Sequence, residues 1–195
     1  MILYFDTETT SLHPGQICQI SYVMQTQNSI DAKNFFFSVD SVDFSAQMVH
    51  GFSTEKLSYL SGGKRFIDYF EEIDRDFYSA DVVISHNTAF DFSFMRAEYE
   101  RLGMIFKTKS EFCSMKKSTP ILKLKRSNGA GYKYPKLSEL CACLSISDEE
   151  IMQACGKLFG ADVGYHDARF DTSALFLSMN KYFSIGFFKE IEKLL

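Results

Sequence analysis

Two carboxylates near the N-terminus, Asp6 and Glu8, have a spacing that could hold a metal ion. Side chains alternate between the faces of an extended strand, so residues two apart point the same way. Hard cations such as Mg²⁺ and Mn²⁺ favour oxygen ligands, and one carboxylate can bridge two ions. The pair follows a short apolar run at residues 2–5, which predicts a buried strand that ends at a polar edge. The D-x-E pattern alone is weak evidence, because it arises by chance in chains of this length.

Two further segments place an acid near the start of a predicted helix. Residues 85–91 lead from an apolar run into a helical pattern and carry Asp91, and residues 166–171 carry His166 and Asp171 at the start of another helix. An acid in a first turn often only compensates the helix dipole, which is worth about 0.3–1 kcal/mol. A histidine at such a place is commonly a cap or a surface residue. Each segment therefore has a structural interpretation beside the catalytic one.

The elements that must position these residues form a sheet with helices. Strands are predicted at residues 2–5, 17–24, 34–39 and 81–85, with the first three as an antiparallel meander and a turn at 27–29. Helical periodicity predicts helices at 63–79, 87–103, 136–144, 148–156, 167–182 and 187–195. Asn87 is expected to cap the second helix and Gly103 to end it. This order indicates the α/β or α+β class.

The composition is that of a soluble single domain, residues 1–195. With 46% apolar residues the chain can bury a sizeable core. The 21 basic and 25 acidic residues leave a net charge of −4, which alone does not point to nucleic acid. No signal peptide and no apolar run of about 18 to 20 residues is recognised, so no membrane partner is expected. Five cysteines fit a reducing, cytoplasmic setting, and Cys141 and Cys143 lack the second pair of a zinc site.

Together the segments resemble the three motifs of the DEDDh family of 3′→5′ exonucleases. The family includes the epsilon-type proofreading subunit of bacterial replicative DNA polymerases and related RNA exonucleases. The matching segments are residues 6–12 for the first motif, residues 86–91 for the second, and His166 with Asp171 for the third. Residues 48–51 resemble a segment that faces the substrate pocket in relatives, and residues 136–140 resemble the helix start before the third motif. The resemblance implies a ribonuclease H-like fold with a central mixed five-stranded sheet flanked by helices.

The histidine separates the two types of this family. His166 stands five residues before Asp171, as in the histidine type, whereas the tyrosine type has its Tyr four residues before the acid. That position holds Asp167 in this chain, and Tyr165 is out of register. The chain departs from the family pattern at Ser11, where relatives usually have Gly, and at Arg169, Phe170 and Thr172. None of these departures removes a catalytic group.

The resemblance also implies roles for individual residues. With two divalent ions, Mg²⁺ or Mn²⁺, Asp6 would bridge both, Glu8 and Asp171 would complete the first site, and Asp91 would hold the second. His166 would be the general base, since an imidazole with a pKa near 6.5 can accept a proton from the attacking water. The candidates for contact with the terminal nucleotide are Thr9, Leu12, His50, Asn87 and Phe90. For Leu12 and Phe90, core packing explains the residue equally well.

Residues 116–136 are a candidate track for nucleic acid. They carry seven basic residues and no acid, with Tyr132 and Tyr134 among the charges and a Gly-rich tip at residues 128–131. Phosphate attraction combined with aromatic stacking can hold a single strand without reading its sequence. A solvated loop is the alternative. The basic residues are Lys116, Lys117, Lys123, Lys125, Arg126, Lys133 and Lys136.

The leading functional hypothesis is a metal-dependent 3′→5′ exonuclease. It would act on single-stranded or frayed 3′ ends of DNA and release nucleoside monophosphates in repair, processing or proofreading, the last with a polymerase as partner. An enzyme acting on RNA ends or short oligoribonucleotides is an alternative, since the same site cleaves either sugar unless something senses the 2′-OH. A non-catalytic module that binds nucleic acid or a polymerase is the alternative from another class. The intact carboxylate set argues against the module.

Overall fold

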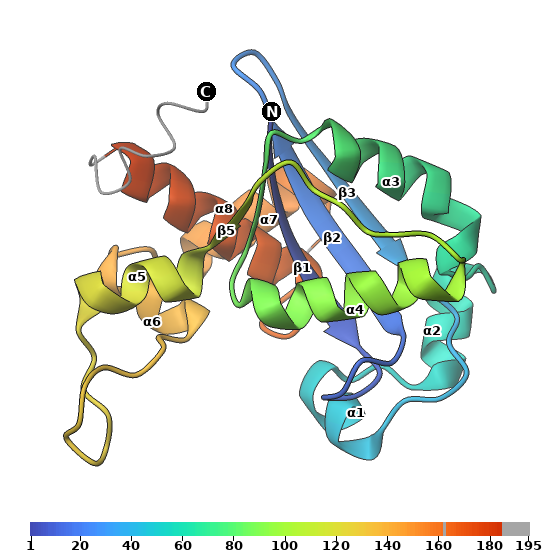
Figure 1. The fold of residues 1–195 in the computed structure, drawn as a ribbon, viewed down its shortest axis with the longest axis horizontal. Coiled ribbons are helices and arrows are strands. Elements are labelled where there is room, and N and C mark those ends of the chain that lie inside the picture. The colour runs from blue at the N-terminus through green and yellow to red at the C-terminus, as the bar shows by residue number, and fades with distance from the viewer. Residues whose placement is uncertain (162, 185–195) are drawn as a thin grey trace.

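A five-stranded mixed sheet forms the centre of the molecule, in a computed structural model that describes residues 1–161 and 163–184. The strands are β1 (Ile2–Thr9), β2 (Ile17–Gln25), β3 (Ile30–Phe36), β4 (Val82–Ser85) and β5 (Glu111–Cys113). Their order in the sheet is β3-β2-β1-β4-β5, with an antiparallel meander of the first three and parallel pairing of β4 and β5. This arrangement confirms the predicted mixed sheet (Figure 1).

Helices flank both faces of this sheet (Figure 1). They are α1 (Phe44–His50), α2 (Thr54–Ser61), the 3₁₀ turn η1 (Phe66–Tyr69), α3 (Phe70–Ser79), α4 (Thr88–Arg101), α5 (Ser114–Leu122), α6 (Leu137–Cys143), α7 (Asp148–Phe159) and α8 (Ala168–Ser184). The predicted helix at residues 187–195 lies outside the described residues. Among the helices of the described ranges, none has the length and apolar character needed to cross a bilayer.

Alternation along β1 divides the core into two layers. Leu3 and Phe5 pack in a cluster with side chains of α3 and α4, whereas Ile2 and Tyr4 pack in a second cluster with α6, α7 and α8. Successive side chains of a strand point to opposite faces. The same alternation therefore directs Asp6 and Glu8 toward the α8 layer and Thr7 toward the α4 layer.

Two strand predictions differ from the structure. β1 does not end at residue 5, because antiparallel pairing with β2 continues, with Asp6 opposite Ser21 and Glu8 opposite Gln19. The strand predicted at residues 34–39 is β3, which begins earlier. A tight turn, closed by the 2.9 Å hydrogen bond from the Thr26 amide to the Ser29 carbonyl, starts the returning strand at once. The resemblance implied a fifth strand, but the position of β5 was not predicted, since three residues are too few to show a period.

The helix predictions fail mainly where the elements are short. The helix predicted at 63–79 starts only at Phe66, because Gly62 and Gly63 have positive φ values of 61° and 76° and Arg65 is extended. It is divided into η1 and α3 at Tyr69, whose φ of −120° and ψ of 3° are not helical. α1, α2 and α5 were not predicted. α1 has only seven residues, and Pro120 lies inside α5, where a proline argues against a helix. The helices predicted at 136–144, 148–156 and 167–182 correspond to α6, α7 and α8.

Candidate active site

Three carboxylates from two elements form a cluster at the end of β1. Asp6 and Glu8 of β1 meet Asp171 from the first turn of α8, and one oxygen of each lies within 4.8 Å of the other two. The parallel pairing of β1 with β4 ends at Tyr4 and Ile84, so β1 extends past its neighbour where the acids lie. Such a set of oxygen ligands fits the preference of Mg²⁺ or Mn²⁺.

Burial makes this cluster electrostatically unfavourable without a cation. Burial raises the pKa of Asp6 well above its usual range, and the charges of Asp91, Asp171 and Glu8 raise it further. Burial, followed by the neighbouring acids, raises the pKa of Glu8 to about 9. Burial also raises the pKa of Asp171 to about 7. A divalent ion would neutralise the repulsion that these shifts express, so the donor set and its electrostatics both fit a metal.

Asp91 approaches the cluster from the other layer. It lies in the first turn of α4, as predicted, is only 3% exposed, and accepts a 2.8 Å hydrogen bond from the Thr7 hydroxyl on its Oδ1. Burial raises its pKa to about 7 although the hydrogen bond from Thr7 lowers it. After burial, Asp91 is the largest influence that raises the pKa of Asp6. Asp91 can therefore act with Asp6, although it lies outside the three-acid group.

Asn87 holds the N-cap position of α4, as predicted, but its side chain does not cap the helix. Its side chain makes no capping hydrogen bond, and its backbone is left-handed, with a φ of 91°. Asparagine tolerates this region better than most residues. The Asn87 carbonyl instead accepts a 2.8 Å hydrogen bond from the Phe90 amide. Asn87 therefore shapes the backbone turn from β4 into α4.

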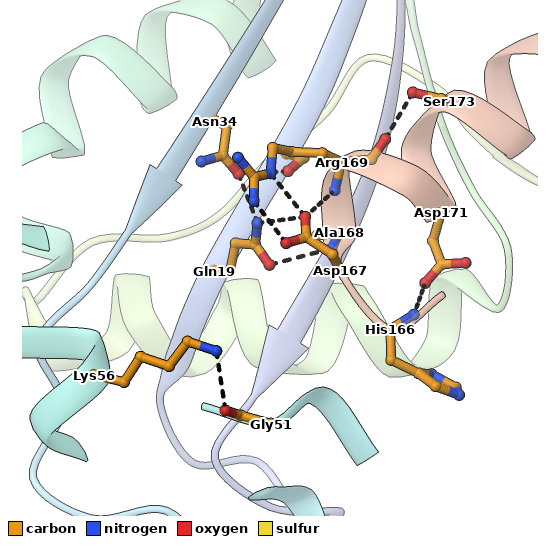
Figure 2. Close-up of polar contacts among 11 residues, drawn as sticks. Gln19, Asn34, Gly51, Lys56, His166, Asp167, Ala168, Arg169, Asp171 and Ser173 are labelled. Atoms are coloured by element: carbon orange, nitrogen blue, oxygen red, sulfur yellow. Dashed lines mark hydrogen bonds and ion pairs between the residues drawn. The ribbon is translucent and has the colours of Figure 1, made fainter. Parts of the chain in front are cut away.

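His166 lies beside Asp171 on the segment that leads into α8. Its backbone is left-handed with a φ of 61°, and its amide donates a 3.2 Å hydrogen bond to Asp171 Oδ2. The side chain is exposed, and Figure 2 shows the imidazole directed away from the Asp171 carboxyl group. Tyr165, by contrast, donates a 2.6 Å hydrogen bond to Asp148.

A polar network that was not predicted fixes this segment to the sheet (Figure 2). Asp167 accepts hydrogen bonds from Gln19 Nε2 at 2.9 Å and from Arg169 Nε at 2.8 Å and Nη2 at 2.7 Å. Gln19 also accepts from the Ala168 amide at 3.1 Å and donates to Asn34 at 2.8 Å. Burial raises the pKa of Asp167, but the hydrogen bonds from Arg169 and Gln19 outweigh it and leave that pKa below its usual value.

The network of Gln19, Asn34, Asp167 and Arg169 is called the α8 clamp below. It joins β2 and β3 to the backbone between His166 and Asp171. A local signal for part of it exists in the sequence, because an Asp directly before a helix is typical of an N-cap, and Asp167 Oδ1 does accept from the Arg169 amide at 3.0 Å. Nothing local indicates the buried partner Gln19.

Four of the five predicted substrate contacts line one cavity of about 300 Å³ next to Glu8. They are Thr9, Leu12, His50 and Phe90, and Asn87 is not among the lining residues. α1, which was not predicted, supplies Ser45, Ala46 and Val49. Leu12 is 75% exposed, so the core-packing explanation is wrong for that residue.

The His50 side chain at this cavity is held by backbone groups. The Phe52 amide donates to His50 Nδ1 at 3.1 Å, and Nε2 lies 3.2 Å from the Thr9 carbonyl, which can only accept. Burial lowers the pKa of His50 and favours the neutral ring that this pattern requires. His50 therefore fixes the position of the Thr9 backbone beside the carboxylates.

The basic residues predicted to follow nucleic acid lie on two elements. Lys116 and Lys117 belong to α5, and the others lie in residues 123–136, here called the hairpin arm, where Lys125 and Tyr132 form an antiparallel bridge. Lys133 forms an ion pair with Glu139 of α6. The cysteine pair also separates, with Cys141 buried and Cys143 exposed.

Comparison with known proteins agrees with this architecture. The model of the family described as RNase_T, Exonuclease, matches residues 3–150, which include Asp6, Glu8 and Asp91. Two structures titled as E. coli ExoI–ssDNA complexes are similar in fold. The zinc-bound form has a TM-score of 0.72 at 15% identity, and the metal-free form has a TM-score of 0.65 at 13% identity. Each match covers 98% of this chain and 42% of the ExoI chain. Comparison with curated proteins gives no match.

Proposed function

Because the chain belongs to the RNase_T exonuclease family, we propose that it is a metal-dependent 3′→5′ exonuclease of the histidine (DEDDh) type that releases nucleoside monophosphates from DNA. The observation that carries this proposal is the cluster of buried Glu8 with half-buried Asp6 and Asp171, and with buried Asp91 beside it. A structural role does not explain the cluster, because uncompensated buried carboxylates destabilise a fold. A site for phosphodiester hydrolysis explains it.

The carboxylates would hold two divalent ions, Mg²⁺ or Mn²⁺. Asp6 would be shared, Glu8 and Asp171 would complete one site, and Asp91, oriented by Thr7, would serve the other. When bound, the ions would neutralise charge on the phosphoryl oxygens and on the departing 3′ oxygen. The protein contributes fixed positions, because strand pairing holds β1 and the α8 clamp holds the start of α8.

His166 is proposed as the general base. Its exposed imidazole can turn about its side-chain bonds toward the cluster, whereas its backbone is tied to Asp171. It would take the proton from the attacking water, a contribution that is typically worth about 10²- to 10⁴-fold in rate. An exposed base also exchanges that proton with solvent readily after each cycle.

The cavity next to Glu8 is proposed to receive the 3′-terminal nucleotide. Its volume of about 300 Å³ lies at the small end of ligand sites, which fits one nucleoside rather than a longer segment. Leu12 is exposed at its edge and Phe90 lines it, so both offer apolar contact to a base or sugar. Entry of the terminal residue here would bring the last phosphodiester bond to the carboxylates and produce 3′→5′ polarity.

DNA is placed before RNA because the similar ExoI structures are titled as complexes with ssDNA. The chain spans less than half of ExoI, so the activity of that whole protein is not transferred to it. The polymerase partner considered from the sequence has no support among the comparisons. Repair or processing of single-stranded ends is therefore the proposed context.

One digestion series tests the proposal. The substrates are 5′-labelled single-stranded DNA, a mismatched duplex and RNA, each with Mg²⁺, Mn²⁺ or EDTA. Stepwise shortening from the 3′ end is expected, and it should disappear with EDTA and in Asp171→Ala. Preference for RNA would support the oligoribonuclease alternative, and binding without cleavage of any substrate would support the non-catalytic module. Activity retained by Asp171→Ala would contradict the proposed site.

A further inference from the structure

The hairpin arm extends from the body of the molecule between α5 and α6. Figure 1 shows it reaching beyond both helices, well apart from α1, whose residues line the cavity. Its two limbs meet through the bridge of Lys125 with Tyr132, and the Lys133 amide donates to the Leu124 carbonyl at 2.8 Å. At its tip, Gly129 and Gly131 have φ values of 73° and 74°. The arm is thus a hydrogen-bonded turn that projects away from the core.

The segment from residue 116 to residue 136 is strongly basic. Residues 116–136 hold seven of the 21 basic residues of the chain and none of its 25 acids. Within the contacts of the described residues, Lys133 is the member of the arm that pairs with an acid, Glu139. Lys125 and Arg126 are exposed, and Arg126 Nε donates at 3.0 Å to the Tyr132 carbonyl. No acid of residues 1–161 or 163–184 forms an ion pair with Arg126. A positive surface on an acidic protein attracts an anionic partner.

Aromatic side chains accompany the charges. Tyr132 and Tyr134 are 42% and 57% exposed, although large aromatic side chains are usually buried. A groove of about 650 Å³ runs along the arm, lined by Lys125, Arg126, Ser127, Asn128, Lys133 and Tyr134. Cations that contact phosphates beside a ring that can stack on a base are the two components of sequence-independent single-strand binding. A lipid headgroup or an acidic peptide would not require the exposed rings.

His86 connects the base of the arm to the catalytic helix. Its Nε2 lies 2.9 Å from the Pro135 carbonyl, so Nε2 carries the proton, and Nδ1 accepts from the Ser114 hydroxyl at 2.8 Å. Burial lowers the pKa of His86, which favours this neutral form. His86 stands at the turn from β4 into α4, five residues before Asp91. The arm is therefore held at its base by the segment that begins the Asp91 helix.

From these features we infer that the hairpin arm binds the single strand on the 5′ side of the bond that is cleaved, so that strands long enough to reach the arm are preferred to short oligonucleotides. This inference rests on the proposed exonuclease function. The cavity would hold the terminal nucleotide, the carboxylates the last phosphate, and the arm a more distant part of the same strand. A dinucleotide fills the cavity and the cleavage site but cannot extend to the arm.

The test is the length dependence of cleavage by the full chain. Wild type and Lys125→Gln/Arg126→Gln are compared on 5′-labelled oligodeoxynucleotides from a dinucleotide to about 16 nucleotides, the range of single-strand sites. The ratio of kcat/KM for the longest to the shortest substrate is expected to fall about tenfold in the variant. The slope of log kcat/KM against log salt should decrease by about 1.4, or about 0.7 for each lost phosphate contact. A Tyr134→Ala variant should lose about tenfold on long strands at an unchanged salt slope.

The matched control is Lys107→Gln/Lys157→Gln, which removes two exposed charges outside the arm. It should keep the wild-type length ratio. An arm variant with an unchanged ratio, or with equal losses at every length, would overturn the inference. Fluorescence anisotropy of a labelled strand of about 16 nucleotides in EDTA separates this result from failure of the proposed function. If the wild type cleaves nothing, weaker binding by the arm variant alone still supports the arm, and equal binding refutes it.

Discussion

The carboxylate cluster and the hairpin arm are opposite in charge, burial and constraint. The cluster joins buried and half-buried acids of β1 and α8 through strand pairing and the α8 clamp. The arm carries exposed cations on a turn whose limbs meet in one β-bridge and a few hydrogen bonds. Hydrolysis requires atoms held within fractions of an ångström, which a packed core can provide. Attraction of phosphates tolerates movement, because the interaction of exposed charges changes slowly with distance.

The same comparison separates what each region contributes to stability. The cluster raises the free energy of the folded state when its acids ionise, because burial and mutual repulsion disfavour the charged form of all four carboxyl groups. Exposed charges of the arm have little such effect, since solvent screens them. Substitutions in the cluster should therefore abolish hydrolysis and stabilise the metal-free protein. Substitutions in the arm should neither abolish hydrolysis nor change the stability of the metal-free protein.

The largest expected effect is that of Asp6→Asn. The amide preserves the size of the side chain but removes the charge shared by both proposed metal sites, so kcat should fall at least about 10³-fold. Without metal the variant should unfold at a higher temperature than the wild type, because one repelling charge is lost. Steady-state kinetics with Mg²⁺ and thermal unfolding in EDTA measure the two effects. Asp31→Asn, at an exposed position on β3, is the control and should change neither.

Replacement of His166 by Asn should reduce kcat by about 10²- to 10³-fold. Asparagine tolerates the left-handed backbone at this position, and the amide bond to Asp171 Oδ2 does not use the side chain. Divalent-ion affinity, measured by calorimetry, should consequently stay near that of the wild type. Wild-type turnover in this variant would remove His166 from the mechanism and leave the cluster without its proposed base.

Stability of the metal-free protein should decrease as pH rises. The pKa values of these carboxyl groups are higher in the folded protein than the value near 4 that is usual for the unfolded chain. The stabilisation that their protonation gives to the folded state is therefore complete below about pH 4. It is lost as pH rises through about 7 for Asp91 and Asp171 and about 9 for Glu8. We expect the free energy of unfolding in EDTA to fall by several kcal/mol between pH 5 and 9, since a difference of one pKa unit between the folded and unfolded states corresponds to about 1.4 kcal/mol.

Denaturant unfolding at several pH values measures this fall. Mg²⁺ or Mn²⁺ should flatten the profile, and Asp171→Asn should reduce its slope, whereas Lys125→Gln/Arg126→Gln should leave it as in the wild type. A flat profile in EDTA would mean that the cluster is not under electrostatic repulsion, and the contrast with the arm would then be lost.

The smallest expected effect is that of Arg169→Ala, which tests whether activity at the carboxylate cluster depends on the α8 clamp. In this variant Asp167 keeps the hydrogen bond from Gln19 but loses its ion pair with Arg169. The free energy of unfolding should fall by about 1–2 kcal/mol. The substitution should also lower kcat several-fold at an unchanged KM, because the start of α8 is less firmly held. The double variant Asp167→Ala/Arg169→Ala should be less destabilised than the sum of the single variants. Full additivity would show that the pair does not act as a unit.

The spacing of residues along the chain was sufficient to predict much of the fold and the acidic character of the candidate site. The i, i+2 spacing placed Asp6 and Glu8 on one face, and helical periodicity placed Asp91 and Asp171 in first turns, as observed. The mixed sheet and the exonuclease resemblance are confirmed. The faces that the side chains occupy follow from the repeats of strand and helix, which the sequence carries within a few residues, whereas the family followed from its motifs.

Features that depend on distant partners could not be obtained in this way. The hydrogen bonds of Thr7 with Asp91 and of Gln19 with Asp167 join residues 84 and 148 positions apart. The left-handed turn at Asn87, the cavity wall from α1 and the pairing of Lys133 with Glu139 were likewise not apparent.

The sequence by itself therefore determined which chemical groups the protein carries and which face of its element each one occupies, because both depend on residue type and local spacing. Only the tertiary structure decided which acids share one buried site and which cations remain exposed. That outcome depends on burial and on contacts between remote segments, and local spacing does not specify either one.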